Sequence, residues 1–261
     1  LASVVDDAEM GITHIVRGAD HVTNTGAQRQ IFEAIDVAPP VFGHHSLLTA
    51  ADGAAFSKRS GALSLGTLRD AGVEPVAVVS MLARLGSALP VEPALGHDRI
   101  LAGFDIAAFG RADTRIDEAE LRQHSEKTLR ALPFETVAPR LAALGLSGAR
   151  AAAFWAAIAP NLDRFDDAAD WARLCRDGAT PLIEEGDRAF VAEALALLPP
   201  RPWDSGTWPA WTAAVKAATG RKGGALFRPL RKALTGRDRG PDMAALMPLL
   251  DHTPGVERAA G

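Results

Sequence analysis

The first fifty residues switch between two spacings of their apolar side chains. The opening positions predict a helix, because apolar residues recur every three or four places at Leu1, Val4, Val5 and Ala8. Gly11 ends that helix, and the β-branched run 12–16 predicts a buried strand. A second helix is predicted to begin with a capping box at Thr25 and Gln28, and the run 41–43 predicts another strand. The buried stripe of the second helix is predicted at Ala27, Ile31, Ala34 and Ile35. This alternation of helix and strand is typical of a parallel sheet.

Beyond residue 62 the pattern is helical. Ser64, Pro75 and Asp117 each stand where a helix is expected to begin, because Ser and Asp cap helices and Pro fits the first turn. From Phe134 onward, glycines and prolines separate helical segments, and no strand pattern intervenes. The sequence therefore predicts a multidomain protein of the α/β plus all-α class. Its three predicted parts are half of an α/β domain over 1–62, a helical connecting region over 63–133 and an all-α domain over 134–261.

A short basic loop, Ser57-Lys58-Arg59, follows the α/β part. An ammonium group beside a guanidinium group is suited to a pyrophosphate leaving group, because charge on the departing phosphates must be neutralised while the α-phosphorus is attacked. The same residues are also typical of a solvated surface turn. On the loop alone, both interpretations stay open.

Composition narrows the classes of function. The chain has 261 residues, and its net charge of −4 gives no overall basic signature, so nucleic-acid contacts would have to come from local patches. Cys175 is the one cysteine, which excludes an internal disulfide or a multi-cysteine zinc site and fits a reducing cytoplasm. No apolar run reaches the length of a membrane span. The α/β pattern starts midway and without an initiator Met, so we expect this chain to be the C-terminal part of a longer protein.

Several motifs occur in a fixed order and spacing. They are Val4-Val5-Asp6-Asp7, Met10-Gly11-Ile12-Thr13-His14, Arg17-Gly18-Ala19-Asp20-His21, Asn24-Thr25-Gly26-Ala27-Gln28, Ser57-Lys58-Arg59 and, farther on, Trp211, 216–223 and 229–237. Together they resemble bacterial glutamyl-tRNA synthetases, which are class I enzymes. The HIGH-motif half of that catalytic domain is not among these residues. The resemblance implies the C-terminal half of a Rossmann-like catalytic domain, then a helical stem-contact region and an all-helical anticodon-binding domain.

The resemblance also implies a glutamate site in the α/β part. Arg17 would bind the amino-acid substrate, and a guanidinium fork suits a carboxylate. Ser3 would lie beside the substrate. The alternative for Ser3 is ordinary helix polarity, and the alternative for Arg17 is an ion pair with Asp6, Asp7 or Asp20.

For ATP, the resemblance implies positions at the strand ends and in the basic loop: Asp20, His21, Leu47, Leu48 and Lys58. Lys58 would contact the ATP phosphates, with Ser57 and Arg59 supporting the loop as the family's version of the KMSKS motif. Ala55 is a departure, because the family has the first lysine of the loop there. Mg²⁺ is expected to arrive with ATP, and no protein metal site is predicted.

The stretch from Lys216 to Arg239 is rich in cations. Eight of them stand against the single acid Asp238, and Arg221, Lys222, Arg228 and Arg231 are the predicted tRNA-binding residues. The alternative is a solvated helix face. Five tryptophans could stack anticodon bases, but we assign them to packing: Trp155, Trp171, Trp203, Trp208 and Trp211.

The activity implied by the resemblance is ATP-dependent attachment of glutamate to tRNA(Glu), with L-glutamate and ATP as small-molecule substrates. A glutaminyl-tRNA synthetase is disfavoured because its distal region is a β-barrel, and short tRNA-modifying relatives are disfavoured by the roughly two hundred residues after the loop. The alternative from another class is a non-catalytic tRNA-binding fragment. We expect a cytoplasmic monomer, not bound to membranes, and no catalysis by these residues alone.

Overall fold

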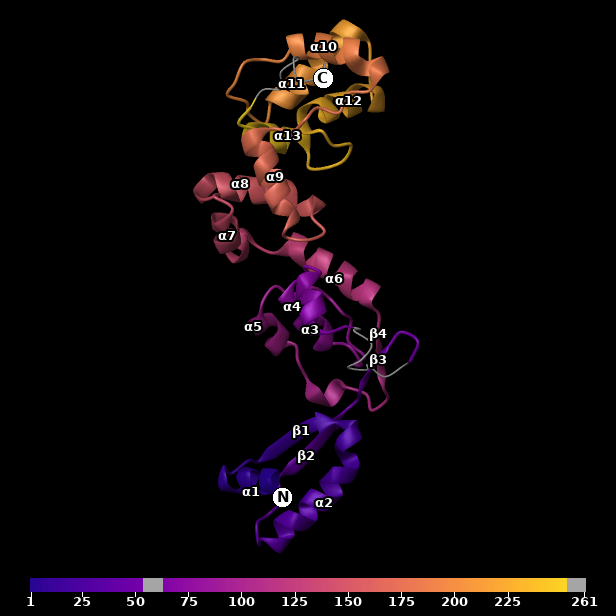
Figure 1. Ribbon diagram of the computed structural model, residues 1–261, viewed down its shortest axis with the longest axis vertical. Helices are drawn as coiled ribbons and strands as arrows, with labels where there is room; N and C mark the ends of the chain where they lie inside the picture. The colour runs from indigo at the N-terminus through magenta and orange to yellow at the C-terminus, as the bar shows by residue number, and fades with distance from the viewer. Residues whose placement is uncertain (54–62, 253–261) are drawn as a thin grey trace. The chain divides into compact units, whose positions relative to one another are not determined.

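The computed structural model describes residues 1–53 and 63–252. The chain divides into two compact units, Leu1–Thr128 and Leu129–Gly261 (Figure 1). In sequence order, the helices and strands of the first unit are α1 (Ala2–Glu9), β1 (His14–Gly18), α2 (Val22–Ala34), β2 (Val41–His45), β3 (Leu48–Ala50), α3 (Leu65–Asp70), α4 (Pro75–Leu82), α5 (His97–Ala102), β4 (Thr114–Ile116) and α6 (Glu118–Ala131), with 3-10 turns at Ala19–His21 and Ile106–Ala108.

The predicted parallel pairing is present near the N-terminus. β1 and β2 run parallel, with Arg17 opposite His44, and α1 and α2 lie beside them (Figure 1). The first strand begins two residues later than the apolar run predicts, and it is not buried as expected, because Val16 is 54% exposed and Val41 is 62% exposed. This pair of strands therefore has apolar side chains that nothing in the described chain covers.

The second helix departs from the prediction at its start. A 3-10 turn leads directly into α2, and His21 rather than Thr25 precedes the first helical residue. Thr25 lies in the second turn, where its hydroxyl donates to the carbonyl of His21 at 3.3 Å, as Ser and Thr inside helices often do. The buried stripe is also rotated, because Phe32 is 1% exposed whereas Ile35 is 39% exposed.

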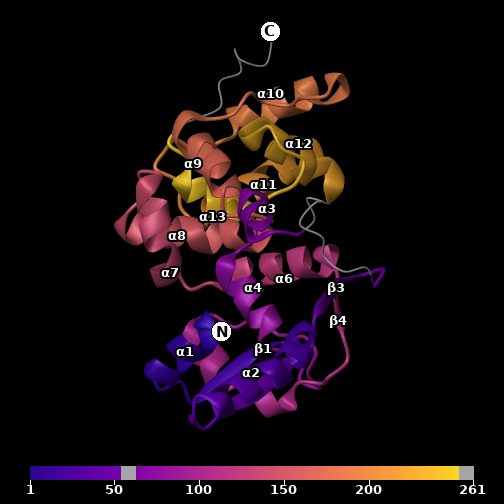
Figure 2. The ribbon, with the colours of Figure 1, turned by 60° about the horizontal axis from the view of Figure 1, so that its bottom comes forward.

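The connecting region contains a short strand that was not predicted. β4 pairs in parallel with β3, with Leu48 opposite Thr114. The predicted helix starts are confirmed: Ser64 and Thr67 form a capping box, Pro75 opens α4, and the Asp117 carboxylate accepts from the backbone N–H of Ala119. The core of this region is formed by Leu68, Val73, Met81, Ile116 and Leu121. Figures 1 and 2 both place α4 beside α6.

The second unit is helical throughout its described residues, as predicted for the distal part of the chain. Its helices, which follow the end of α6, are α7 (Phe134–Ala143), α8 (Gly148–Ile158), α9 (Asp167–Asp177), α10 (Arg188–Ala196), α11 (Thr207–Thr219), α12 (Gly224–Thr235) and α13 (Met243–Leu246), with 3-10 turns at Ala159–Asn161, Glu185–Asp187 and Met247–Leu249. In the part of the chain that the structure describes, no single helix is long and apolar enough to cross a membrane. One helix pair, bent by 108° between Phe134–Ala143 and Gly148–Asn161, meets that criterion jointly.

The tryptophans pack within the second unit, as predicted. Trp155, Trp171, Trp203 and Trp211 are each at most 6% exposed. The indole N–H of Trp211 donates to the carbonyl of Ala194 at 2.8 Å, so its polar atom is satisfied inside the core. Trp208 is half-buried and stacks between Trp211 and Phe227, with ring centroids 5.6 Å and 6.2 Å away.

Candidate functional site

Arg17 is held at the carboxyl end of β1 by neutral partners. Its Nη2 donates to the Thr25 hydroxyl at 2.5 Å, and that hydroxyl lies 2.9 Å from Nε2 of His44 on the neighbouring strand. The guanidinium also lies over the ring of Phe42, 5.2 Å from its centroid. The Nε of Arg17 is buried without a hydrogen-bond partner. The guanidinium is therefore oriented by the fold and retains an unused donor.

The alternative role for Arg17 was an ion pair with a nearby acid. Within the described residues, no ion pair joins Arg17 to Asp6, Asp7 or Asp20. Asp20 instead lies 3.8 Å from the ring of His21, which also meets the Asn24 amide at 3.1 Å. Among the described residues, the positive charge of Arg17 thus forms no ion pair and is available to an anion.

Several of the predicted ATP-binding residues meet around Gly18. A Cβ at Gly18 would overlap the Asp20 carboxylate and would lie 3.0 Å from the Leu47 side chain, so these two side chains both lie against Gly18. The carbonyl of Leu47 accepts from the backbone N–H of Thr114 at 2.9 Å, which ties this segment to β4. Leu48 begins β3 and is 38% exposed. Asp20, His21 and Leu47 are therefore close neighbours at one strand end.

The remaining predicted residues of this site are not joined to it by the described contacts. Ser3 is exposed on α1, and no hydrogen bond or ion pair among the described residues links it to Arg17. The basic loop, with Ser57, Lys58, Arg59 and Ala55, lies outside the described residues.

In the second unit, two of the predicted tRNA-binding arginines are bound by acids. Arg228 makes a two-point ion pair with Asp238, with nitrogen–oxygen distances of 2.6 and 2.7 Å. The hydrogen bond from Arg228, aided by the charge of Lys232, lowers the pKa of Asp238 to about 2. Arg221 pairs with Asp187 at 2.5 Å and lies over the ring of Phe190. These charges are already compensated inside the fold.

The other two tRNA-binding candidates differ from each other. Arg231 donates to the carbonyl of Pro241 at 2.8 Å, and burial lowers the pKa of its guanidinium. Lys222 lies in the exposed turn between α11 and α12 and makes no ion pair with a described residue. Of the four predicted residues, Lys222 alone presents a charge that nothing in the described chain engages.

Residues 1–97 match the family model for class I tRNA synthetases (E and Q), catalytic domain, and residues 133–258 match the model for an anticodon binding domain. Glutamate–tRNA ligase 2 of Dinoroseobacter shibae is 53% identical over 97% of this chain. Glutamate–tRNA ligase 1 of Ruegeria pomeroyi is 53% identical over 100% of it. The chain belongs to the glutamyl-tRNA synthetase family. It spans 58% of the length of each of these two relatives.

A solved synthetase structure has the same fold. The glutamate tRNA ligase from Elizabethkingia meningosepticum, determined in complex with its amino acid, aligns with a TM-score of 0.73 over 98% of this chain and 57% of its own length, at 21% identity. The order of a partial Rossmann-like sheet and a helical anticodon domain, as expected from the sequence, is confirmed by this match and by the two family models.

Sequence reasoning missed the acids that engage the basic stretch 216–239. Asp187 and Glu184 come from the segment before α10, and Glu184 accepts from Lys232 at 2.7 Å. These partners stand some forty residues before α12 in the sequence, so no local charge pattern points to them. The pair formed by Arg228 and Asp238 was accessible in principle, because the two residues are only ten positions apart, across the end of α12 at Gly236. No local sequence pattern indicates the contact between His44 and Thr25 either.

Proposed function

We propose that this chain is part of an ATP-dependent glutamate–tRNA ligase. The observation that carries the proposal is the guanidinium of Arg17 at the carboxyl end of a parallel strand, oriented by Thr25 and not ion-paired with any described carboxylate. Ligands of open α/β sheets bind at that edge. A substrate carboxylate would supply the missing negative charge, and the family match over residues 1–97 favours glutamate as its source.

The reaction would proceed in two steps. An oxygen of the glutamate carboxylate attacks the α-phosphorus of ATP, so that a new oxygen–phosphorus bond forms and pyrophosphate leaves. The terminal ribose hydroxyl of tRNA then attacks the acyl carbon, and AMP leaves with the bonding electrons. The protein contributes mainly position and charge, since the chemistry needs no covalent intermediate on a side chain.

Each predicted residue has a place in this scheme. Arg17 binds the amino acid, Asp20, His21 and Leu47 adjoin the nucleotide, and Lys58 neutralises the phosphates from the basic loop. The cation Lys58 fits a triphosphate, which would carry Mg²⁺ bound to its own oxygens. Ser3 and Leu48 are assigned to the edges of the same two subsites, and Ser57 and Arg59 to support of the loop.

The second unit is proposed to bind tRNA(Glu), and its match to an anticodon binding domain over residues 133–258 supports this role. Within it, Lys222 would contact phosphate directly, while Arg221, Arg228 and Arg231 would need to exchange their present partners to do so. A tRNA-binding fragment without catalysis is the second candidate for the chain by itself, because the chain spans only 58% of its relatives. The division into parts at 62/63 and 133/134 is retained as part of the proposal.

The test is ATP–pyrophosphate exchange with tRNA present. We expect a full-length protein containing these residues to catalyse exchange with glutamate and not with glutamine, and the 261-residue chain alone to be inactive while retaining affinity for tRNA. Exchange supported by glutamine would contradict the substrate assignment. Strong exchange by the chain alone would contradict the view that it is only part of the catalytic apparatus.

A further inference from the structure

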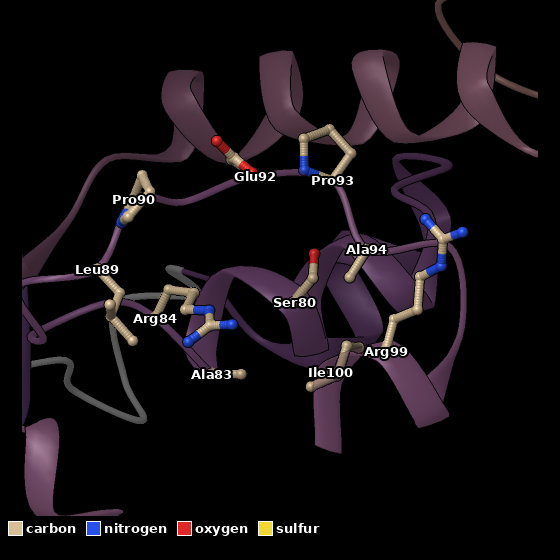
Figure 3. Close-up of a pocket in the computed structure, with 10 residues that line it drawn as sticks. All are labelled: Ser80, Ala83, Arg84, Leu89, Pro90, Glu92, Pro93, Ala94, Arg99 and Ile100. Carbon is tan, nitrogen blue, oxygen red and sulfur yellow. The ribbon is translucent and has the colours of Figure 1, made fainter. Parts of the chain in front are cut away.

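The first unit contains a cavity of about 220 Å³. The residues that line it are separated along the sequence from Arg17 and from the basic loop. It is formed by α4, the segment that follows it and the start of α5, and Figure 3 shows its lining: Ser80, Ala83, Arg84, Leu89, Pro90, Glu92, Pro93, Ala94, Arg99 and Ile100. The catalytic family match ends at residue 97 and the anticodon match begins at 133, so part of this lining falls outside both.

Arg84 is fixed in this cavity by the backbone. Its Nη1 donates to the carbonyl of Gly103, and a side chain at Gly103 would overlap the guanidinium, so the glycine makes room for it. No carboxylate of the described residues forms an ion pair with Arg84. An arginine held by one carbonyl keeps most of its five donors for another acceptor. The arrangement is therefore preorganised for an anion.

Arg99 supplies a second cation to the same cavity. It is exposed at the first turns of α5 and forms no ion pair within the described chain. Figure 3 shows its side chain and that of Arg84 on opposite sides of Ser80. Most arginines of the second unit are paired with acids, as Arg228 is with Asp238. Arg84 and Arg99 therefore bring to one cavity two guanidinium groups that have no ion pair with a described residue.

The floor and walls between the two cations limit what could bind there. Ser80 is 2% exposed, and its hydroxyl lies 2.7 Å from Nε2 of His124 and 3.1 Å from the carbonyl of Ala77, so the floor is polar but already satisfied. The walls include the apolar side chains of Leu89 and Ile100. A ligand with an aliphatic middle and a negative group at each end matches this lining.

We propose that this pocket binds a short aliphatic dicarboxylate, with Arg84 and Arg99 each holding one carboxylate. A guanidinium fork matches the two oxygens of a carboxylate, and the apolar walls cover the methylene groups between them. Glu92 also lines the cavity, and its carboxylate opposes any anion there, so a ligand with more than the two negative groups that the arginines hold would be disfavoured further. The small volume favours a free small molecule over a segment of nucleic acid.

The experiment is a titration of the 261-residue chain with succinate, followed by NMR of the backbone amide of Gly103 and of the Arg84 guanidinium. Arg99→Gln is expected to weaken binding roughly tenfold, because a hydrogen bond between charged groups is lost. Arg111→Gln is the matched control, since Arg111 is exposed in the same unit, lacks an ion pair with any described residue and is outside the lining. It should bind succinate like the parent chain.

A second variant tests the Arg84 end of the pocket without removing a charge. Gly103→Ala should push the Arg84 guanidinium aside and also weaken succinate binding, with a thermal melt confirming that the chain still folds. The proposal is overturned if succinate binds Arg99→Gln as well as it binds Arg111→Gln. It is equally overturned if Arg99→Gln loses affinity for tRNA but not for succinate, because the pocket would then be a contact for a nucleic-acid phosphate.

Discussion

Two arginines in each unit of this chain are held in opposite ways. In the first unit, Arg17 and Arg84 are oriented by a hydroxyl and a backbone carbonyl, and neither has a carboxylate partner among the described residues. In the second unit, Arg221 and Arg228 are held by Asp187 and Asp238. A cation oriented by uncharged groups can still bind an anionic ligand, whereas the charge of a cation paired with an acid is already compensated within the fold.

The difference teaches that a basic stretch of sequence is not the same as a basic surface. The segment from Lys216 to Arg239 has eight cations and one acid when it is considered alone. In the folded unit, Glu184, Asp187 and Asp170 reach the same cations from other helices and turns. The net field at α12 is therefore smaller than the sequence count indicates, while Arg17 and Arg84 of the first unit have no carboxylate partner among the described residues.

The largest effect is expected from replacing Arg17, which has no ion pair with a described residue. In the full-length protein, Arg17→Gln should lower kcat/KM for glutamate in pyrophosphate exchange by roughly tenfold to a hundredfold, because a hydrogen bond between charged groups is lost. The melting temperature should hardly change, since Arg17 has no ion pair to lose. Arg29→Gln on the exposed face of α2 is the control and should leave both quantities unchanged. A large loss of stability with normal kinetics would make Arg17 a structural residue and remove the contrast.

The features predicted well from the sequence are those that depend on neighbours along the chain. Ser64 and Asp117 were recognised as helix starts because a cap acts within three residues. The parallel pair β1 and β2 followed from alternating spacing. Thr25 failed as a cap because its hydroxyl serves Arg17 and His44, which depends on the tertiary fold. β4 was missed because a strand of three residues is too short to show an alternation of apolar and polar side chains. Its pairing with β3 is what defines it as a strand.

The candidate site follows the same division. The strand-end position of Arg17 could be predicted locally. The sequence could not predict that Arg17 has no ion pair with a described acid. Asp6, Asp7 and Asp20 are all close to it in sequence, and tertiary packing decides whether any of them reaches it. The roles of Lys58 and of the other loop residues stay predictions.

An intermediate effect is expected on tRNA binding. Lys222→Ala should reduce the slope of log affinity against log salt by about 0.7–0.9, the contribution of one phosphate contact. Arg228→Ala should change the slope less, because its charge is compensated by Asp238. The measurement is a series of tRNA titrations between low and moderate salt with both variants. Equal changes in slope would mean that tRNA displaces Asp238 from Arg228, and the contrast between the two residues would then hold only for the free chain.

The smallest effect concerns the acid that compensates α12. The hydrogen bond from Arg228 lowers the pKa of Asp238 to about 2, below the value of about 3.9 expected for an unfolded chain. A depressed pKa adds stability above the unfolded value, and this stability is lost as the pH falls toward the folded value. Asp238→Asn should therefore lower the melting temperature at pH 7 by on the order of 1–3 °C, as for an exposed pair. The difference between variant and parent should shrink below pH 4 and disappear near pH 2. Glu193→Gln, an exposed acid on α10 with no ion pair to a described residue, should show no such pH-dependent difference. If the difference for Asp238→Asn stayed constant from pH 7 to pH 2, the carboxylate charge would not be what holds Arg228, and the compensation of α12 would have to rest on Glu184, which pairs with Lys232.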